Sequence, residues 1–227
     1  TRARFKTKSA ESIARLALRN YFAGALILAY DDFLKTAAET RHDIQLLSNR
    51  LDASIETVCH RLSTLQRPGA KGLPFYFVKI DRAGNVVKRH SATRFQFARF
   101  GGSCPRWNVH QAFEQNSNKF TSQVAQMPDG VRYLCVATSI TKHQPDYRSG
   151  ERRYALGIGC EVQYADAVVY ADGLAVDEIS SPEPIGVNCR ICPRDNCDQR
   201  AFPAVDKEPF IDSGQRGIVP YRVKAAD

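Results

Sequence analysis

Three cysteines stand close together near the end of the chain, in the stretch CRICPRDNCDQRAFP. The spacing Cys189-x2-Cys192-x4-Cys197 lets several sulfurs reach one centre, as in zinc and iron–sulfur sites. Three arginines are interleaved with them and would favour ionised thiols: Arg190, Arg194 and Arg200. The sequence therefore predicts a metal or cluster centre, ahead of a redox disulfide or idle thiols.

Such a centre normally has four ligands, so one must come from elsewhere in the chain. Cys160 is our choice, because the small residues Gly157 and Gly159 before it would allow a bulky group to approach. Cys104, which follows two glycines, is the rival. The predicted ligands are Cys160, Cys189, Cys192 and Cys197, and spacing alone does not separate zinc from an iron–sulfur cluster.

The other two cysteines and the overall cysteine usage give further expectations. Cys135 alternates with apolar neighbours and Cys59 lies on a helical apolar face, so both are predicted to be structural thiols. Seven cysteines in a chain without a secretory signal favour a reducing cytoplasm over a disulfide framework. No zincin, phosphate-loop or serine-hydrolase motif occurs in the sequence, which predicts a protein that is not an enzyme.

Charge is distributed unevenly along the 227 residues. Residues 1–115 hold 19 Lys and Arg against 9 Asp and Glu, whereas residues 116–227 hold 13 against 15. A basic first half suits an anionic partner such as nucleic acid or a phosphate-bearing ligand. No apolar run reaches the length of about 18 residues that a membrane span needs. The stretch Tyr21–Tyr30 is shorter and is predicted to be a buried helix.

The elements that position these residues fall into two regions. Helical periodicity predicts one helix over about 9–29 and a second helix, capped by Asp31 or Asp32, that ends near Thr40. It also predicts a helix-turn-helix-like pair over 43–65, with Ser54 as the second N-cap. From residue 73 onward, aromatic and β-branched runs predict strands over 73–80 and 86–90, a pair around the turn PDG, and a buried strand ending near Cys160. The fold class is thus α+β: a helical region over 1–67 and a mixed-sheet region over 70–227 with the cysteine cluster and an irregular tail.

Four segments resemble one family. They are ALRNYFAGALILAYDDFL (17–34), VCHRLSTLQRPGAKGLPFYFVKIDRAGNVVKR (58–89), FARFGGSCPRWNVHQAF (97–113) and GVNCRICPRDNCDQRAFP (186–203). Together they are similar to the short-chain fatty-acyl transcriptional regulators of bacteria. The resemblance implies that 1–67 is the end of an IrrE-like part and that 70–227 is a GAF-like sensor domain. It also implies that a DNA-binding domain is missing from this chain, which starts at Thr1 and has Met127 as its only methionine.

The resemblance implies a short acyl-CoA effector from propionate or acetate metabolism. Such a ligand needs cations, a stacking surface and an apolar slot. The candidate contacts are Phe75, Phe77, Lys79, Lys88, Arg89, Phe97, Arg99, Arg106 and Trp107.

We therefore expect a cytoplasmic, homodimeric effector-binding region of a regulator. We expect a 4Fe-4S cluster in preference to zinc, with a role in redox sensing. The alternative function is direct DNA binding through residues 43–65.

Overall fold

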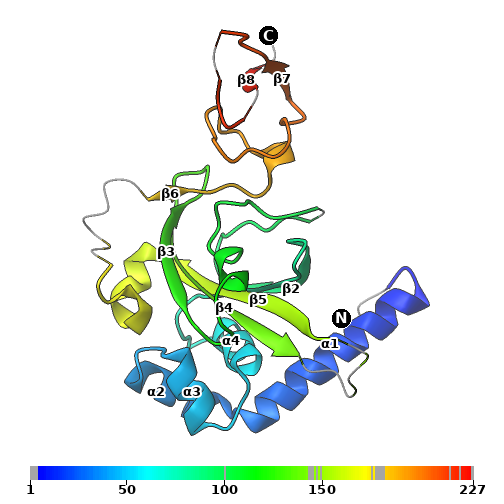
Figure 1. Cartoon of the computed structure of the whole chain (residues 1–227). Helices are drawn as coiled ribbons and strands as arrows, with labels where there is room; N and C mark the ends of the chain where they lie inside the picture. Colours follow the sequence, from blue (N-terminus) through cyan, green and yellow to red (C-terminus); the bar gives the residue numbers. More distant parts are fainter. Residues whose placement is uncertain are drawn as a thin grey trace.

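The first part of the fold is helical, as the computed structural model in Figure 1 shows. The structure describes residues 5–99, 101–142, 146, 148, 150–174, 176, 182–214, 216–219 and 221–225. The helices are α1 (Lys8–Ile27), α2 (Tyr30–Glu39), α3 (Ile44–Arg50) and α4 (Ile55–Ser63).

Side-chain caps explain where three of these helices begin. Thr7, Asp43 and Ser54 accept hydrogen bonds from the backbone N–H groups three residues later, which satisfies donors that a helix leaves unpaired. Between α3 and α4, Asp52 adopts a left-handed conformation with φ of 45°. Asp is one of the few residues other than glycine that enters this region readily. The predicted helix-turn-helix-like pair is therefore present.

The second part is built on a six-stranded sheet with the order β2-β1-β5-β4-β3-β6. All neighbours are antiparallel except β3 and β6, so the sheet is mixed. A separate hairpin in the tail pairs β7 with β8. The strands are β1 (Tyr76–Ile80), β2 (Val86–Ser91), β3 (Thr121–Gln126), β4 (Arg132–Lys142), β5 (Arg152–Glu161), β6 (Glu183–Pro184), β7 (Lys207–Phe210) and β8 (Arg222–Ala225).

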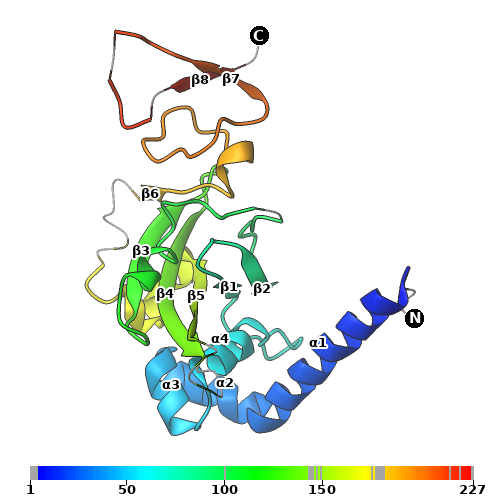
Figure 2. The same ribbon diagram turned by 45° about the vertical axis from the view of Figure 1, so that its right-hand side comes forward.

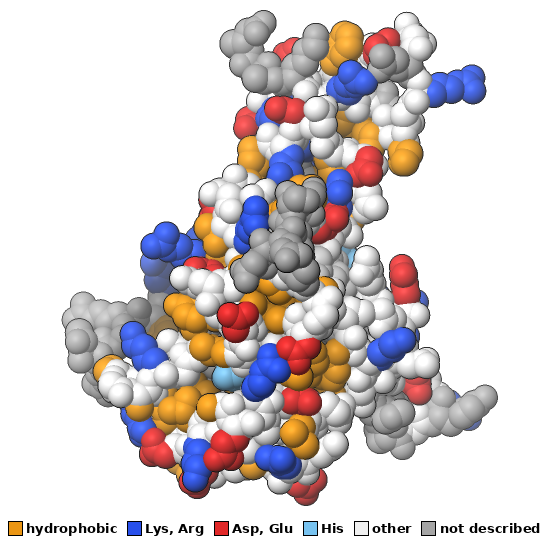
Figure 3. All heavy atoms as spheres, turned by 90° about the vertical axis from the view of Figure 1, so that its left-hand side faces the viewer, with side chains coloured by type: hydrophobic (Ala, Val, Ile, Leu, Met, Phe, Trp, Pro, Cys, Tyr) orange, Lys and Arg blue, Asp and Glu red, His pale blue; other side chains and the backbone are white. Residues whose placement is uncertain are grey.

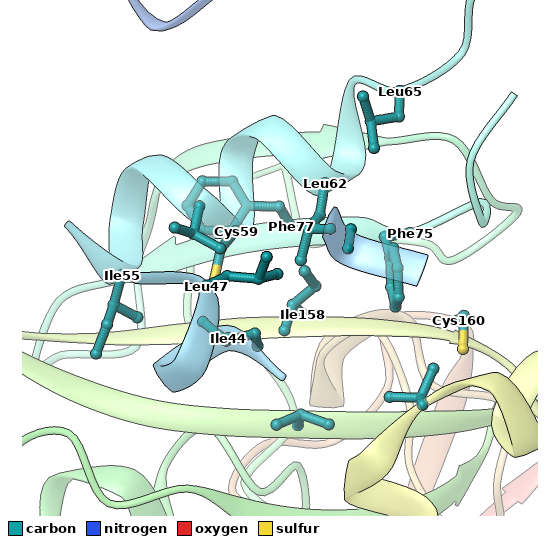
Figure 4. Packing of buried hydrophobic residues seen from close by; sticks show 14 of the residues in the cluster. Ile44, Leu47, Ile55, Cys59, Leu62, Leu65, Phe75, Phe77, Ile158 and Cys160 are labelled. Carbon is teal, nitrogen blue, oxygen red and sulfur yellow. The ribbon is translucent and has the colours of Figure 1, made fainter. Parts of the chain in front are cut away.

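Both faces of this sheet are covered, which gives the fold two cores. Every residue of β1 is buried. Phe75 and Phe77 face the helical side with Leu47, Val58 and Leu62, and Figure 4 shows several of these side chains between α4 and the sheet. On the other face, Tyr76 and Tyr133 of the sheet pack against Phe95 and Trp107, which come from the segment between β2 and β3. The helices therefore share a core with the sheet.

Gly159 on β5 is required by this close packing. A Cβ added there would overlap the carbonyl oxygen of Leu134 on β4 and would lie 2.7 Å from the fully buried Tyr76 ring. Neither group can move aside without disturbing the strand ladder or the core. Gly157, two residues earlier, likewise leaves room for Val109. These glycines admit core side chains, and not the bulky ligand group that the sequence suggested.

We expect Gly159→Ala to lower the free energy of unfolding by about 3 kcal/mol, because the added methyl group overpacks a closed site. Urea unfolding followed by circular dichroism measures this change. Gly24→Ala is the matched control, because nothing lies within 4 Å of a Cβ at that half-buried helical position. The control should be neutral or slightly stabilising. Equal urea midpoints for Gly159→Ala and the unmodified protein would contradict the packing argument.

The helix α1 extends away from the rest of the molecule (Figure 2). No residue of α1 is buried, and Phe22, Leu26 and Ile27 are each more than 60% exposed. The prediction of a buried helix over Tyr21–Tyr30 was therefore wrong for most of that stretch. Among the described residues, no helix combines the length and apolar character needed to cross a membrane.

Two other segments form only short 3-10 helices. The segment after β5 holds η2 (Val162–Ala167) and η3 (Val169–Ala171). The segment before β3 holds the 3-10 turn η1 (Gln111–Phe113). The side chain of Asn108, just before this turn, donates to the carbonyl oxygens of Thr121 and Cys135, which ties the segment to the sheet.

Candidate functional site

The tail projects beyond the sheet at the end marked by β6, as Figures 1 and 2 show. A loop with the 3-10 turn η4 (Cys189–Ile191) carries three of its cysteines. Burial raises the pKa of Cys104, and negative charge on Cys189 and Cys192 raises it further. Cys197 is among the groups that raise the pKa of Arg106, and Arg106 also pairs with Asp198, the residue next to Cys197. We refer to these four residues, Cys104, Cys189, Cys192 and Cys197, as the tail cysteine cluster.

Hydrogen-bond donors surround these sulfurs. The backbone N–H groups of Gly186 and Arg106 lower the pKa of Cys104 in part, against the larger effect of burial. The N–H of Ala201 lies 3.4 Å from Cys189 Sγ. A Cβ at Gly186 would approach Cys192 Sγ to 2.8 Å, so only glycine leaves that sulfur its present space. Soft thiolates with such donors are the chemistry that zinc and iron–sulfur clusters require.

The arginines of this region mainly hold the loop in place. Arg200 is buried and its guanidinium donates to the carbonyl oxygens of Cys189 and Cys192. Arg194 donates to Ile185 and, at 2.8 Å, to Gln126 at the end of β3. Arg106 pairs with Glu183, and with Asp198 at 2.7 Å. These contacts fasten the tail to the sheet, and they engage Arg106 with carboxylates and not with a phosphate.

The tail cysteine cluster is not closed into a coordination site in this structure. Within the described ranges, no three or more Cys, His, Asp or Glu side chains are arranged to hold a metal ion, and all seven cysteines are free. The donor set fits a zinc ion or an iron–sulfur cluster by its chemistry. The sulfurs would have to draw closer to bind either one, so the metal centre stays a prediction.

Cys160 does not lie with the tail cysteines. Its side chain belongs to the core cluster on the helical side of the sheet, together with Leu134, Ala165 and Val168. Figure 4 shows Cys160 in this core, with Phe75 and Ile158. Burial raises its pKa to about 12, and the nearby charges of Cys135 and Glu161 add to the effect. A thiol in this position is neutral at pH 7 and resembles a core residue. The prediction that Cys160 joins the three tail cysteines is therefore corrected. Cys104, the rival candidate, lies on the other face of the sheet.

A groove of about 820 Å³ runs between α1 and the hairpin of β1 and β2, and we call it the α1 groove. Its α1 side presents apolar residues including Ile13, Leu16 and Tyr21, and its opposite side presents Lys79, Lys88 and Arg89. Rings of His60, His90 and Tyr154 also line it. Burial and the charge of Lys88 lower the pKa of His60 to about 4, so this imidazole is neutral near pH 7.

Only three of the nine expected ligand contacts line the α1 groove. Lys79, Lys88 and Arg89 do so. Phe75 and Phe77 are buried in the core under the helices, and Trp107 is buried on the opposite face with Phe97 packed against the same core. Arg99 is exposed, and Arg106 lies beside the tail. The structure therefore does not bring these six residues to one site. Phe75 and Phe77 share a face of β1 with Lys79 but are covered by the helices, and Phe97 and Trp107 belong to the core on the opposite face.

Other lining residues were missed by the sequence reasoning. Six residues of α1 contribute to the groove, although the sequence predicted only that they belong to a helix: Ile13, Leu16, Ala17, Leu18, Asn20 and Tyr21. His60 and His90 line it with ring centroids 6.0 Å apart. They are far apart in sequence, so only the packing of α4 on the sheet brings them together.

The α4 helix is unsuited to the alternative function of direct DNA binding. Every residue of Ile55–Ser63 is buried or half-buried, including Arg61, whose Nε donates to the Leu28 carbonyl at 3.0 Å. A recognition helix must present an open face to a DNA groove. In addition, Lys and Arg side chains are interspersed with Asp and Glu on the face in Figure 3. Direct binding through residues 43–65 is therefore not supported.

Known proteins similar to this chain match nearly all of it. The family described as "Short-chain fatty acyl coenzyme A regulator, C-terminal" matches residues 64–221, and the family described as "IrrE N-terminal-like domain" matches residues 2–63. A propionyl-CoA carboxylase regulator of Cereibacter sphaeroides is 58% identical over 221 residues, which is 97% of this chain and 47% of that protein. The HTH-type transcriptional regulator PrpR of Mycobacterium tuberculosis is 47% identical, over 93% of this chain and 43% of that protein.

A solved structure agrees with these sequence matches. A Mycobacterium tuberculosis transcriptional regulator superposes with a TM-score of 0.88 at 46% identity, covering 95% of this chain and 65% of that chain. The chain spans about half the length of the curated relatives it matches.

Proposed function

Because the chain belongs to the short-chain fatty acyl coenzyme A regulator family, we propose that it is the effector-binding region of a bacterial transcription regulator. We further propose that it binds an acyl-CoA in the α1 groove. The regulator controls propionate or acetate metabolism and contacts DNA through a domain outside this chain. The chain itself is not an enzyme. The GAF-like character of the sheet region and a homodimeric assembly are part of the same proposal.

The observation that carries this proposal is the composition of the α1 groove. An acyl-CoA has negatively charged phosphates, an adenine ring and an apolar acyl arm. The groove offers lysine and arginine on one side, apolar residues on the other, and the Tyr154 ring between them. Its volume of about 820 Å³ lies within the range usual for sites that bind small molecules.

Two of the three cations of the groove are held in place by neighbouring groups. Lys79 Nζ lies 4.3 Å from the centroid of the Tyr154 ring. Arg89 donates from Nη1 to the Ala98 carbonyl at 3.1 Å. Positioned cations of this kind lose less freedom when they bind phosphate, which favours affinity.

The second part of the proposal is a centre at the tail cysteine cluster. Cys104, Cys189, Cys192 and Cys197 would hold a 4Fe-4S cluster, or zinc as the alternative, and the bound group would cross-link the tail to the sheet. Loss of an oxidant-sensitive cluster would release the tail, which is the proposed basis of redox sensing. The contacts of Arg106 and Arg194 support a tail that is held against the sheet beside this centre.

Calorimetry with acetyl-CoA, propionyl-CoA and free CoA tests the effector assignment. We expect saturable binding of the acyl-CoA thioesters with dissociation constants of roughly 1–100 μM, or about 5–8 kcal/mol of binding free energy. Binding should weaken as salt is raised, because phosphate–lysine contacts contribute. No heat with any of the three ligands, at several temperatures, would overturn the assignment.

A further inference from the structure

The carboxylate of Glu56, in the first turn of α4, meets three lysines that come from three different strands. Its oxygens lie 2.9 Å from Lys79 Nζ, 3.6 Å from Lys88 Nζ and 3.2 Å from Lys142 Nζ. The Glu56 side chain is only 16% exposed. Burial tends to raise the Glu56 pKa, but hydrogen bonds and charges from Lys79 and Lys142 outweigh burial and lower it. Glu56 is therefore ionised near pH 7.

One carboxylate cannot neutralise three ammonium groups. Lys79 and Lys88 also face each other directly across the β1–β2 pair, where like charges repel. The cluster therefore keeps a net positive charge of about two. A ligand group with two negative charges, such as a phosphate, would satisfy this charge better than Glu56 alone does.

The lysines differ in how readily they can leave Glu56. The Lys79 side chain is 11% exposed and lies against Tyr154, so it is fixed in place. The side chains of Lys88 and Lys142 are 38% and 54% exposed, so they can turn toward a ligand. Lys79 and Lys88 line the α1 groove, and Glu56 and Lys142 line a neighbouring pocket of about 630 Å³. The cluster thus stands at the border of both hollows.

We infer that Glu56 is an internal competitor for the phosphates of the ligand. In the free protein Glu56 holds the three lysines together, and a phosphate-bearing ligand in the α1 groove draws Lys88, and then Lys142, away from it. Glu56 thereby sets the affinity and the charge selectivity of the site. This inference rests on the proposed function of the groove and names the residue that tunes it.

The Glu56→Gln variant tests the inference, because it removes the competing charge and keeps the size of the side chain. We expect acetyl-CoA to bind about tenfold more tightly to Glu56→Gln than to the unmodified protein, as measured by calorimetry. The gain should shrink at high salt. Glu39→Gln is the matched control: Glu39 pairs with a single exposed lysine, Lys35, at 3.9 Å, and its replacement should leave the affinity unchanged. Equal or weaker binding to folded Glu56→Gln would overturn the inference.

Two further measurements keep the inference testable on its own. If Glu56→Gln does not fold, a crystal structure of the unmodified protein with acetyl-CoA replaces it. Lys88 Nζ should then lie on a phosphate oxygen and more than 4 Å from Glu56, and three lysines remaining on Glu56 would refute the competition. If no CoA compound binds, the proposed function fails. Inorganic pyrophosphate then decides the inference: tighter binding to Glu56→Gln supports it, and no binding to either protein rejects it.

Discussion

We expect Cys104→Ala to lose the bound metal, whereas Cys160→Ala retains it. The measurement is anaerobic purification followed by analysis of iron, zinc and inorganic sulfide, together with a visible spectrum. Partners outside the coordination shell already change metal affinity by about 10–100-fold, so the loss of a ligand should lower the metal content at least tenfold. Iron with equal sulfide would indicate a cluster, and a colourless protein with stoichiometric zinc would remove the redox role.

The two cysteines differ in the environment that their sulfurs meet. Burial raises the pKa of Cys104, but the backbone N–H groups of Gly186 and Arg106 oppose this rise, and a metal ion deprotonates a thiol that it binds. Cys160 has only burial and the neighbouring Cys135 and Glu161, all of which raise its pKa. A neutral thiol inside an apolar core cannot serve as a ligand without exposing that core.

Cys160→Ala is a matched control for this experiment, because it also removes a buried sulfur. Each variant must keep the circular dichroism spectrum of the unmodified protein before its metal content is compared. Metal retained by Cys104→Ala but lost from Cys160→Ala would restore Cys160 as the ligand. Metal-free unmodified protein, prepared anaerobically, would remove the centre altogether.

The choice between these two cysteines shows where sequence reasoning reached its limit. The grouping of Cys189, Cys192 and Cys197 is local and follows from their spacing. The fourth partner is remote, and both Cys104 and Cys160 follow glycines. Strand register decides against Cys160. Cys160 pairs with Leu134 and points to the helical face, while the adjacent Gly159 pairs with Cys135 on the other face, where Cys104 lies. A change of one residue reverses the face, and the register depends on contacts distant in sequence.

The same limit applies to the helices and to the groove. Ser54 was identified as a cap because its role depends on residues within one turn. The apolar residues of α1 gave the correct helix but the wrong burial, since periodicity reports a face and not what covers it. The strand β1 was predicted from its aromatic run. That β1 is buried on both faces could not be predicted without the whole sheet. The assignment of Phe75 to one core and Trp107 to the other depends on the sheet in the same way.

Reversing one charge in the α1 groove should have the second large effect. Lys88→Glu replaces a cation that faces the groove with a carboxylate, and it places this second negative group beside Glu56. A hydrogen bond to a charged group contributes about 1.5–3 kcal/mol, and the new repulsion adds to its loss. We expect acetyl-CoA to bind about 100-fold more weakly, which corresponds to about 2.7 kcal/mol. Calorimetry at low and high salt measures the change.

The matched control is Lys35→Glu, which makes the same change of charge on an exposed part of α2. The Lys35 side chain is 79% exposed and is not among the residues that line the α1 groove. If Lys88 acts by contact, Lys35→Glu should change the affinity by less than about threefold, because exposed charges beyond roughly 10 Å are screened at ordinary salt. Equal losses for both variants would indicate general attraction between the basic chain and an anionic ligand. Because that attraction disappears at high salt more completely than a seated contact does, a large difference that survives added salt would place the phosphates at Lys88.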